Sequence, residues 1–259
     1  MKLWFELYTL PESNPLRREA SKIVRVWKNG HQSPFQRVAI AYNTTPLERM
    51  ETIQPFTLAP WEERIPAAPE ELEKGRTPLT DPRRVVGVAV SSSCRNDVVG
   101  LGGVVQFPQH LREVSGDETF AFTLGPRTEQ NPHTGELAAI AYATRKMLPE
   151  ICNHHIILYT RNKGAMLTIL QPRQPAGQEF IRCIYDAVES LKERGNKISI
   201  RWLPSDDENE LLYRAKEEAR KMTKEGSVPR VQFPATRSRT LNLAKSSLPI
   251  DKTSTRNGQ

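Results

Sequence analysis

The feature that most constrains the fold is the run Val85–Val90, which reads VVGVAV. β-Branched residues favour strands, and a strand without polar alternation is typical of a sheet that helices cover on both faces. The chain around this run must therefore supply further strands and several helices. Hydrophobic residues make up 37% of the 259 residues and there are 20 prolines, so we expect one compact domain with loosely packed arms.

Further strand and helix patterns follow this run in a regular series. Short turns join the first three strands, which indicates an antiparallel meander. The complete order, β-β-β-α-β-α-α-β-α, predicts an α/β fold in which helices pack on a five-stranded mixed sheet. Glycines at 100, 102 and 103 interrupt the second strand and indicate a bulge or close packing. After Val85–Val90, the patterns predict strands at 98–107, 118–124, 156–160 and 198–203, and helices at 134–147, 162–170, 177–194 and 207–223.

Composition divides the chain into four segments. Residues 1–61 form an N-terminal segment with a helical pattern at Leu16–Trp27, and residues 62–82 are a proline-rich linker. The predicted domain occupies residues 83–223. Residues 224–259 form a basic tail that we expect to be disordered. Such a tail favours an anionic partner, and nucleic acid is the first partner to consider. The alternative is a solvated tail that binds nothing specific.

Composition also excludes several classes of protein. Lys and Arg number 37 against 30 Asp and Glu, a net charge of +7. The cysteines at 94, 152 and 183 form no CxxC pair, which argues against zinc and favours a reduced, intracellular setting. The pattern does not distinguish nucleus from cytoplasm. The first ten residues lack signal-peptide chemistry, and no run of 18 apolar residues predicts a membrane span.

Several short motifs point to one family. Gly135–Ile140 reads GELAAI at the start of the first predicted helix. Tyr159-Thr160-Arg161-Asn162-Lys163 follows the fourth strand, and Trp202-Leu203-Pro204 ends the fifth. With the element order, these motifs resemble the ribonuclease H domain of LINE-type (non-LTR) retrotransposon polyproteins of filamentous fungi. Residues 10–61 resemble the connector between polymerase and ribonuclease H in those elements, and residues 237–248 resemble the arm after the domain.

The resemblance implies four acidic positions that hold two Mg²⁺ ions for cleavage of the RNA strand in an RNA–DNA hybrid. In this sequence the matching positions are Ser91, Glu136, Arg161 and Tyr213, although the turns around Ser91 and Tyr213 allow a slip of one or two residues. Only Glu136 is a carboxylate. A single carboxylate cannot offset the desolvation of two Mg²⁺ ions, and Arg161 would repel them. Arg161 is instead expected to form a salt bridge with Glu136.

We therefore expect a catalytically degenerate ribonuclease H-like protein of retrotransposon origin, with no bound metal or cofactor, that still binds an RNA–DNA hybrid or duplex. One alternative is an active Mg²⁺-dependent hybrid ribonuclease, in which acids near the mouth of the predicted site form a displaced metal site. Three of these acids, residues 206–208, have a second interpretation, in which they cap the last helix. A second alternative is a protein-interaction scaffold whose partners the sequence does not reveal. The candidate nucleic-acid contacts are Arg95, Asn96, Asn162, Lys163, Trp202, Arg237 and Arg239, and the acids of the displaced site are Asp97, Asp206, Asp207 and Glu208.

Overall fold

The computed structural model describes six stretches of the chain: residues 10–22, 50–52, 64–67, 84–111, 117–171 and 176–246. The chain forms two compact units, one of residues 54–233 and one that combines residues 1–53 with 234–259. Within the described stretches, no helix is long and apolar enough to cross a membrane.

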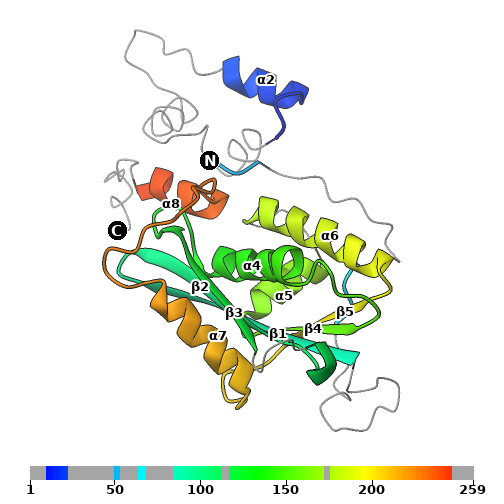
Figure 1. Ribbon diagram of the computed structural model, residues 1–259. Coiled ribbons are helices and arrows are strands. Elements are labelled where there is room, and N and C mark those ends of the chain that lie inside the picture. The colour runs from blue at the N-terminus through cyan, green and yellow to red at the C-terminus, as the bar shows by residue number, and fades with distance from the viewer. Residues whose placement is uncertain are drawn as a thin grey trace, which may run out of the picture. The chain divides into compact units, whose positions relative to one another are not determined.

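The larger unit is built on one mixed sheet whose strand order is β3-β2-β1-β4-β5 (Figure 1). The first three strands pair antiparallel, whereas β1 pairs with β4, and β4 with β5, in parallel. This arrangement confirms the predicted ribonuclease H-like α/β fold. The strands are β1 (Val85–Arg95), β2 (Val98–Gln106), β3 (Glu118–Pro126), β4 (His155–Thr160) and β5 (Lys197–Trp202).

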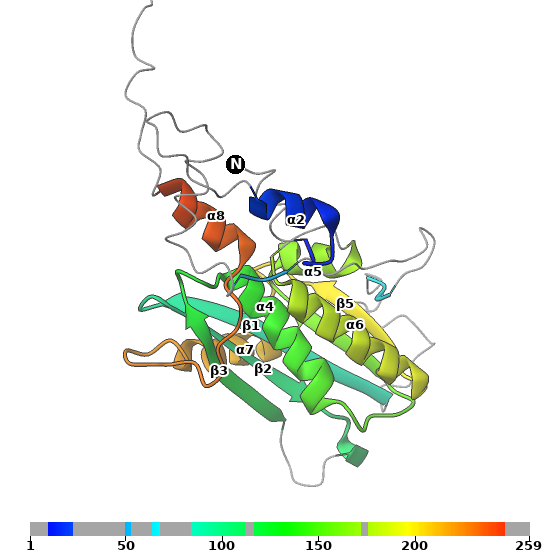
Figure 2. The same cartoon turned by 90° about the horizontal axis from the view of Figure 1, so that it is seen from above.

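Helices cover both faces of the sheet, as the apolar run in β1 predicts. The helices α4, α5 and α6 lie on one face and α7 lies on the other (Figure 1). Seen from above, α4 and α6 run side by side across the sheet (Figure 2). A π-helical turn at Ala143–Met147 ends α4, and a short 3-10 helix spans Gln109–Leu111. The helices are α4 (Pro132–Tyr142), α5 (Lys163–Leu170), α6 (Gln178–Glu193) and α7 (Glu210–Lys221), in the predicted order.

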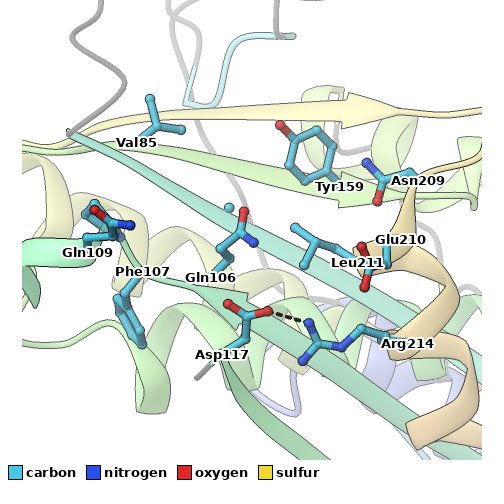
Figure 3. Close-up of a pocket in the computed structure, with 12 residues that line it drawn as sticks. Val85, Gln106, Phe107, Gln109, Asp117, Tyr159, Asn209, Glu210, Leu211 and Arg214 are labelled. Atoms are coloured by element: carbon cyan, nitrogen blue, oxygen red, sulfur yellow. Dashed lines mark hydrogen bonds and ion pairs between the residues drawn. The ribbon is translucent and has the colours of Figure 1, made fainter. Parts of the chain in front are cut away.

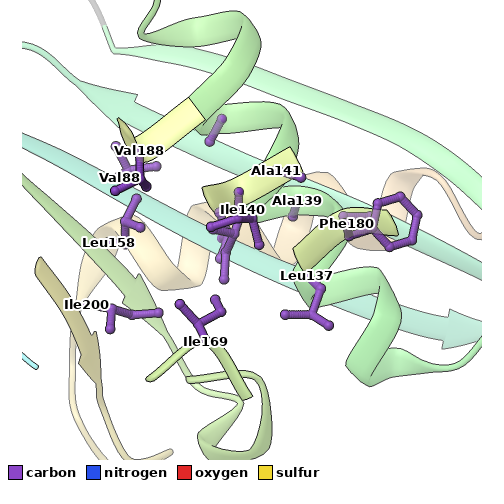
Figure 4. Packing of buried hydrophobic residues seen from close by; sticks show 14 of the residues in the cluster. Val88, Leu137, Ala139, Ile140, Ala141, Leu158, Ile169, Phe180, Val188 and Ile200 are labelled. Carbon is purple, nitrogen blue, oxygen red and sulfur yellow. The ribbon is translucent and has the colours of Figure 1, made fainter. Parts of the chain in front are cut away.

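The two faces of β1 have different neighbours. Val88 belongs to the main core, where side chains of β4 and β5 meet Leu137 and Ile140 of α4 (Figure 4). Ala89 points to the opposite face and packs with Leu212 and Ala215 of α7. Because side chains alternate along a strand, a run of small and β-branched residues fills both cores at once.

The glycines of β2 allow α7 to lie against the sheet. A Cβ atom on Gly102 would lie 2.5 Å from the backbone nitrogen of Ala219, and one on Gly100 would lie 2.6 Å from the Ala219 carbonyl oxygen. The register of β2 against β3 also shifts between Val99 and Gly100. Both expectations for these glycines, a bulge and close packing, are therefore confirmed.

Four residues of the predicted linker pack on the domain. Ile65 is buried in the main core, and the backbone N–H of Ile200 donates to the Pro66 carbonyl at 3.1 Å. Ala67 forms a parallel bridge with Ile200 on β5. Residues 64–67 are therefore part of the folded domain, whereas the rest of the predicted linker, residues 62–63 and 68–82, lies outside the described residues.

In its described residues the smaller unit contains two helices, α2 (Pro15–Lys22) and α8 (Arg237–Ser246). The helix predicted at Leu16–Trp27 is confirmed up to Lys22, beyond which the chain is not described until residue 50. Glu51 accepts a hydrogen bond from the Arg237 backbone N–H at 2.7 Å, and the Glu51 N–H donates to the Ala235 carbonyl at 3.0 Å. A residue far away in the sequence therefore satisfies a backbone donor at the start of α8, which lies within the predicted basic tail.

Replacement of Gly102 with Ala is expected to lower the free energy of unfolding by about 1–3 kcal/mol, because α7 must move away from the sheet. Gly87→Ala is the matched control. Its Cβ would meet the Leu211 Cδ1 at 3.4 Å, an ordinary van der Waals contact. Urea unfolding of the two variants measures the difference, and equal stabilities would contradict the close-packing interpretation.

Candidate functional site

A polar pocket of about 600 Å³ lies where β1 and β4 end, between α4 and α7. All four positions that the resemblance matches to acidic residues line this pocket, so the fold brings them together. A slip of the alignment around Ser91 would not add a carboxylate, because residues 91–93 are all serine. The lining residues are Ser91, Ser92, Pro132, Glu136, Arg161, Asn162, Lys163, Tyr213, Lys216 and Arg220.

Three asparagine caps position the helices that form the walls of the pocket. Asn131 caps α4 by accepting from the Thr134 N–H at 2.9 Å, and Asn162 caps α5 by accepting from the Ala165 N–H at 3.0 Å. Asn209 caps α7 by accepting from the Leu212 N–H at 3.0 Å. The prediction that residues 206–208 cap the last helix is therefore wrong, because the α7 cap is the next residue, Asn209.

Glu136 lies at the bottom of the pocket and is 3% exposed. Its Oε1 accepts a hydrogen bond from the Thr160 hydroxyl at 2.6 Å. Burial raises the pKa of Glu136 to about 7, although hydrogen bonds from Thr160 and Ser92 and the charge of Lys216 favour the ionised form. Near neutral pH this carboxyl group therefore carries only a partial negative charge.

Lys216, rather than Arg161, is the cation that faces Glu136. The Lys216 Nζ donates to the Ser92 carbonyl at 2.5 Å, and its charge interacts with Glu136. Burial lowers the pKa of Lys216, and the nearby cations Arg220, Arg95 and Arg161 act in the same direction. The sequence offered one signal for this residue: Tyr213, Lys216 and Arg220 are spaced to lie on one face of α7.

The expected salt bridge between Arg161 and Glu136 is wrong. The side chain of Arg161 is exposed, and its guanidinium donates to the Asp207 carbonyl at 2.7 Å. Side chains alternate along a strand, so the inward direction at the end of β4 belongs to the fully buried Thr160. Arg161, the next residue, points to solvent.

Cations therefore dominate the described lining of the pocket. The lining contains one carboxyl group, that of Glu136, and four cationic side chains, Arg161, Lys163, Lys216 and Arg220. Arg220 also pairs with Glu217 on the same helix, a partly exposed pair that is worth little energy. This charge balance favours an anionic ligand, and the cations come from α5, from α7 and from the residue that follows β4.

The donor set of this pocket does not fit two Mg²⁺ ions. Mg²⁺ requires oxygen ligands and is held in such sites by carboxylates, of which the pocket has one. None of the acids considered for a displaced site, Asp97 and residues 206–208, lines the pocket. Across the described stretches, no group of three or more His, Cys, Asp or Glu residues could hold a metal ion.

Of the predicted nucleic-acid contacts, two line the pocket, two lie near it and three lie elsewhere. Asn162 and Lys163 line the pocket, and Arg95 lies close enough to lower the pKa of Lys216. Trp202 lies beside the pocket, where its Nε1–H donates to the Arg161 carbonyl at 3.1 Å and its ring centroid is 5.1 Å from the Lys163 Nζ.

The remaining three predicted contacts, Asn96, Arg237 and Arg239, do not line the pocket and make other contacts or lie in the other unit. The side-chain amide of Asn96 donates to the Thr223 carbonyl at 2.9 Å and so ties the β1–β2 turn to the end of α7. Arg237 and Arg239 belong to α8 in the smaller unit.

A second pocket, of about 690 Å³, lies near the start of β1 and the first turns of α7 (Figure 3). An ion pair between Asp117 and Arg214 crosses it. Its charged lining residues are these two and Glu210, so among the described residues it has no excess of cations. Of these two pockets, the one of about 600 Å³ that contains Glu136 is therefore the better candidate for an anionic ligand.

Comparison with known proteins finds similar solved structures only. No family model and no curated protein matches the chain. An N-terminal RNase H domain from Mycobacterium tuberculosis, solved as a fusion with maltose-binding protein, is 13% identical, with a TM-score of 0.40 over 54% of this chain and 99% of that chain. RNase H1 of the halophilic archaeon Halobacterium salinarum is 15% identical, with a TM-score of 0.39 over 53% and 96%.

A third solved structure, LC11-RNase H1 in complex with an RNA/DNA hybrid, is 11% identical, with a TM-score of 0.41 over 53% of this chain and 96% of that chain. All three TM-scores are below 0.5. The fold is therefore assigned from the strand order and helix placement of this chain itself.

The raised pKa of Glu136 predicts a specific dependence of stability on pH. In the folded protein the pKa is about 7, against an ordinary value of 4.5. The favourable contribution of Glu136 to the free energy of unfolding is therefore fully present below pH 4.5. It is lost as the pH rises through 7, which lowers the free energy of unfolding by up to about 3 kcal/mol. Glu136→Gln is expected to remove this loss.

Urea unfolding of the natural protein and Glu136→Gln across pH 4 to 8 tests this expectation, since other carboxyl groups cancel in the difference. We expect the variant to gain stability relative to the natural protein as the pH rises. Parallel curves would contradict a buried carboxyl group with a raised pKa.

Proposed function

We propose that this chain is a nucleic-acid-binding protein of ribonuclease H-like fold, derived from a non-LTR retrotransposon, that holds an RNA–DNA hybrid or duplex without cleaving it. The observation that carries the proposal is the cationic pocket where the resemblance expects a metal-binding acidic site. Arg161, Lys163, Lys216 and Arg220 line it, with one buried carboxyl group beneath them.

The charge of the pocket favours a phosphodiester as its ligand. Every nucleotide of a nucleic acid carries a negative charge, and Lys and Arg side chains bind it with release of counterions. In a two-metal site, Mg²⁺ ions would supply the positive charge that meets the phosphate. Here the side-chain cations supply that charge directly, so binding does not require a metal.

The same residues argue against hydrolysis. Two-metal cleavage needs carboxylates to hold the ions and to set their separation. At the matching positions this chain has Ser91, Arg161 and Tyr213, and Lys216 lies beside the remaining acid. We therefore propose a pseudoenzyme, with catalysis lost and affinity for the backbone retained.

The proposed origin rests on motifs that the binding function alone does not require. They are the GELAAI stretch at residues 135–140, the Trp202-Leu203-Pro204 end of β5, and the flanks at 10–61 and 237–248, which resemble the sequences on either side of the domain in those elements.

Binding and cleavage can be measured on the same samples. A labelled RNA–DNA hybrid is expected to bind in EDTA, without added metal, and to remain intact in Mg²⁺ or Mn²⁺. Cleavage that Glu136→Gln abolishes would show that the chain is an active hybrid ribonuclease. If neither binding nor cleavage occurred, the proposal would fail and an interaction scaffold would become the better interpretation.

Arg161→Gln tests whether the pocket is the binding site. Because Arg161 is exposed, its loss should leave the fold intact, weaken hybrid binding at all sequences and reduce the slope of log affinity against log salt by about 1. Lys221→Gln is the matched control, since Lys221 is an exposed cation that pairs with Glu218 and does not line the pocket. Equal effects of the two variants would place binding elsewhere.

A further inference from the structure

Among the described residues that line the cationic pocket, Tyr213 is the one aromatic side chain. It is 63% exposed, whereas its neighbour Leu212 is 1% exposed and packs on the sheet. Tyr213 is therefore not needed for the core. Among the described residues its side chain has no hydrogen bond and no ring contact, and its high exposure leaves the ring accessible to a ligand.

Tyr213 and two cations form one stripe along α7. Residues 213, 216 and 220 are spaced at i, i+3 and i+7, which places their side chains on the same face of a helix. At 1.5 Å per residue the stripe is about 10 Å long. All three residues line the pocket, with Arg161 and Lys163 also in its lining.

This combination of an aromatic face with adjacent cations suits a single strand better than a duplex. A cationic groove follows the phosphates, while an exposed ring stacks on an unpaired base. Bases inside a duplex already stack on their neighbours, so a duplex gains nothing from Tyr213 unless a base is turned out of the helix. The cations, in contrast, attract the phosphates of both forms.

We infer that Tyr213 is a stacking platform for an unpaired base, so that this pocket prefers single-stranded nucleic acid to the hybrid or duplex. The inference rests on the proposed function, in that the cations of the pocket bind the phosphates of a hybrid or duplex, and goes beyond it, because an unpaired base adds a contact with Tyr213 that a paired base does not make. The phosphates next to the stacked base lie against Lys216 and Arg220, and the hydroxyl group of Tyr213 is not required.

Fluorescence anisotropy with a labelled 12-nucleotide RNA, alone and as its RNA–DNA hybrid, tests this inference in EDTA with the full chain. The natural protein is expected to bind the single strand more tightly. Tyr213→Leu is expected to weaken single-strand binding about tenfold and to leave hybrid binding unchanged, while Tyr213→Phe keeps the natural affinity for both. Tyr213→Gln is a second variant without a ring, in case the leucine variant fails to fold.

The outcomes separate this inference from the proposed function. Equal losses for single strand and hybrid, no loss for either, or a loss in Tyr213→Phe would each overturn the stacking role. The proposed function would still stand in those cases if Arg161→Gln weakened binding of both nucleic acids. If the natural protein bound neither nucleic acid, both proposals would fail.

Discussion

The parallel pairing of β1 with β4 is the interaction on which the candidate site depends. Its register places Ala89 opposite Tyr159, so the residues just beyond them, Ser91 and Arg161, reach the same edge of the sheet. α4 packs on β1 from one face and contributes Glu136, while α7 packs from the other face and contributes its stripe. The pocket thus joins residues from all three layers, and the glycines of β2 set how closely the third layer approaches.

Charge balance at this edge determines what the pocket can hold. A buried carboxylate is costly unless it is hydrogen-bonded or paired. Thr160, Ser92 and Lys216 offset part of that cost, yet burial remains the largest effect on Glu136. The negative charge is therefore weak near neutral pH, whereas the guanidinium groups at the mouth remain charged. A pocket of this kind complements an anion directly and does not complement a pair of divalent cations.

The order of the elements was predictable because local patterns carry it. An apolar run without polar residues marks a doubly covered strand, and an amphipathic stripe marks α6. The site was predictable only in part. The sequence could place Ser91, Glu136, Arg161 and Tyr213 at matching positions, but it could not show that Thr160 takes the inward direction and that Lys216 reaches Glu136. Those contacts depend on side-chain directions at the meeting of three elements.

The sequence by itself determined the succession of strands and helices and the excess of positive charge, since each follows from residue type and spacing. Tertiary structure decided which residues meet. It placed residues 64–67 against β5, capped α8 with Glu51 and turned Arg161 toward solvent. Such contacts join segments far apart in the chain, and their geometry depends on strand register and helix approach, which no local pattern specifies.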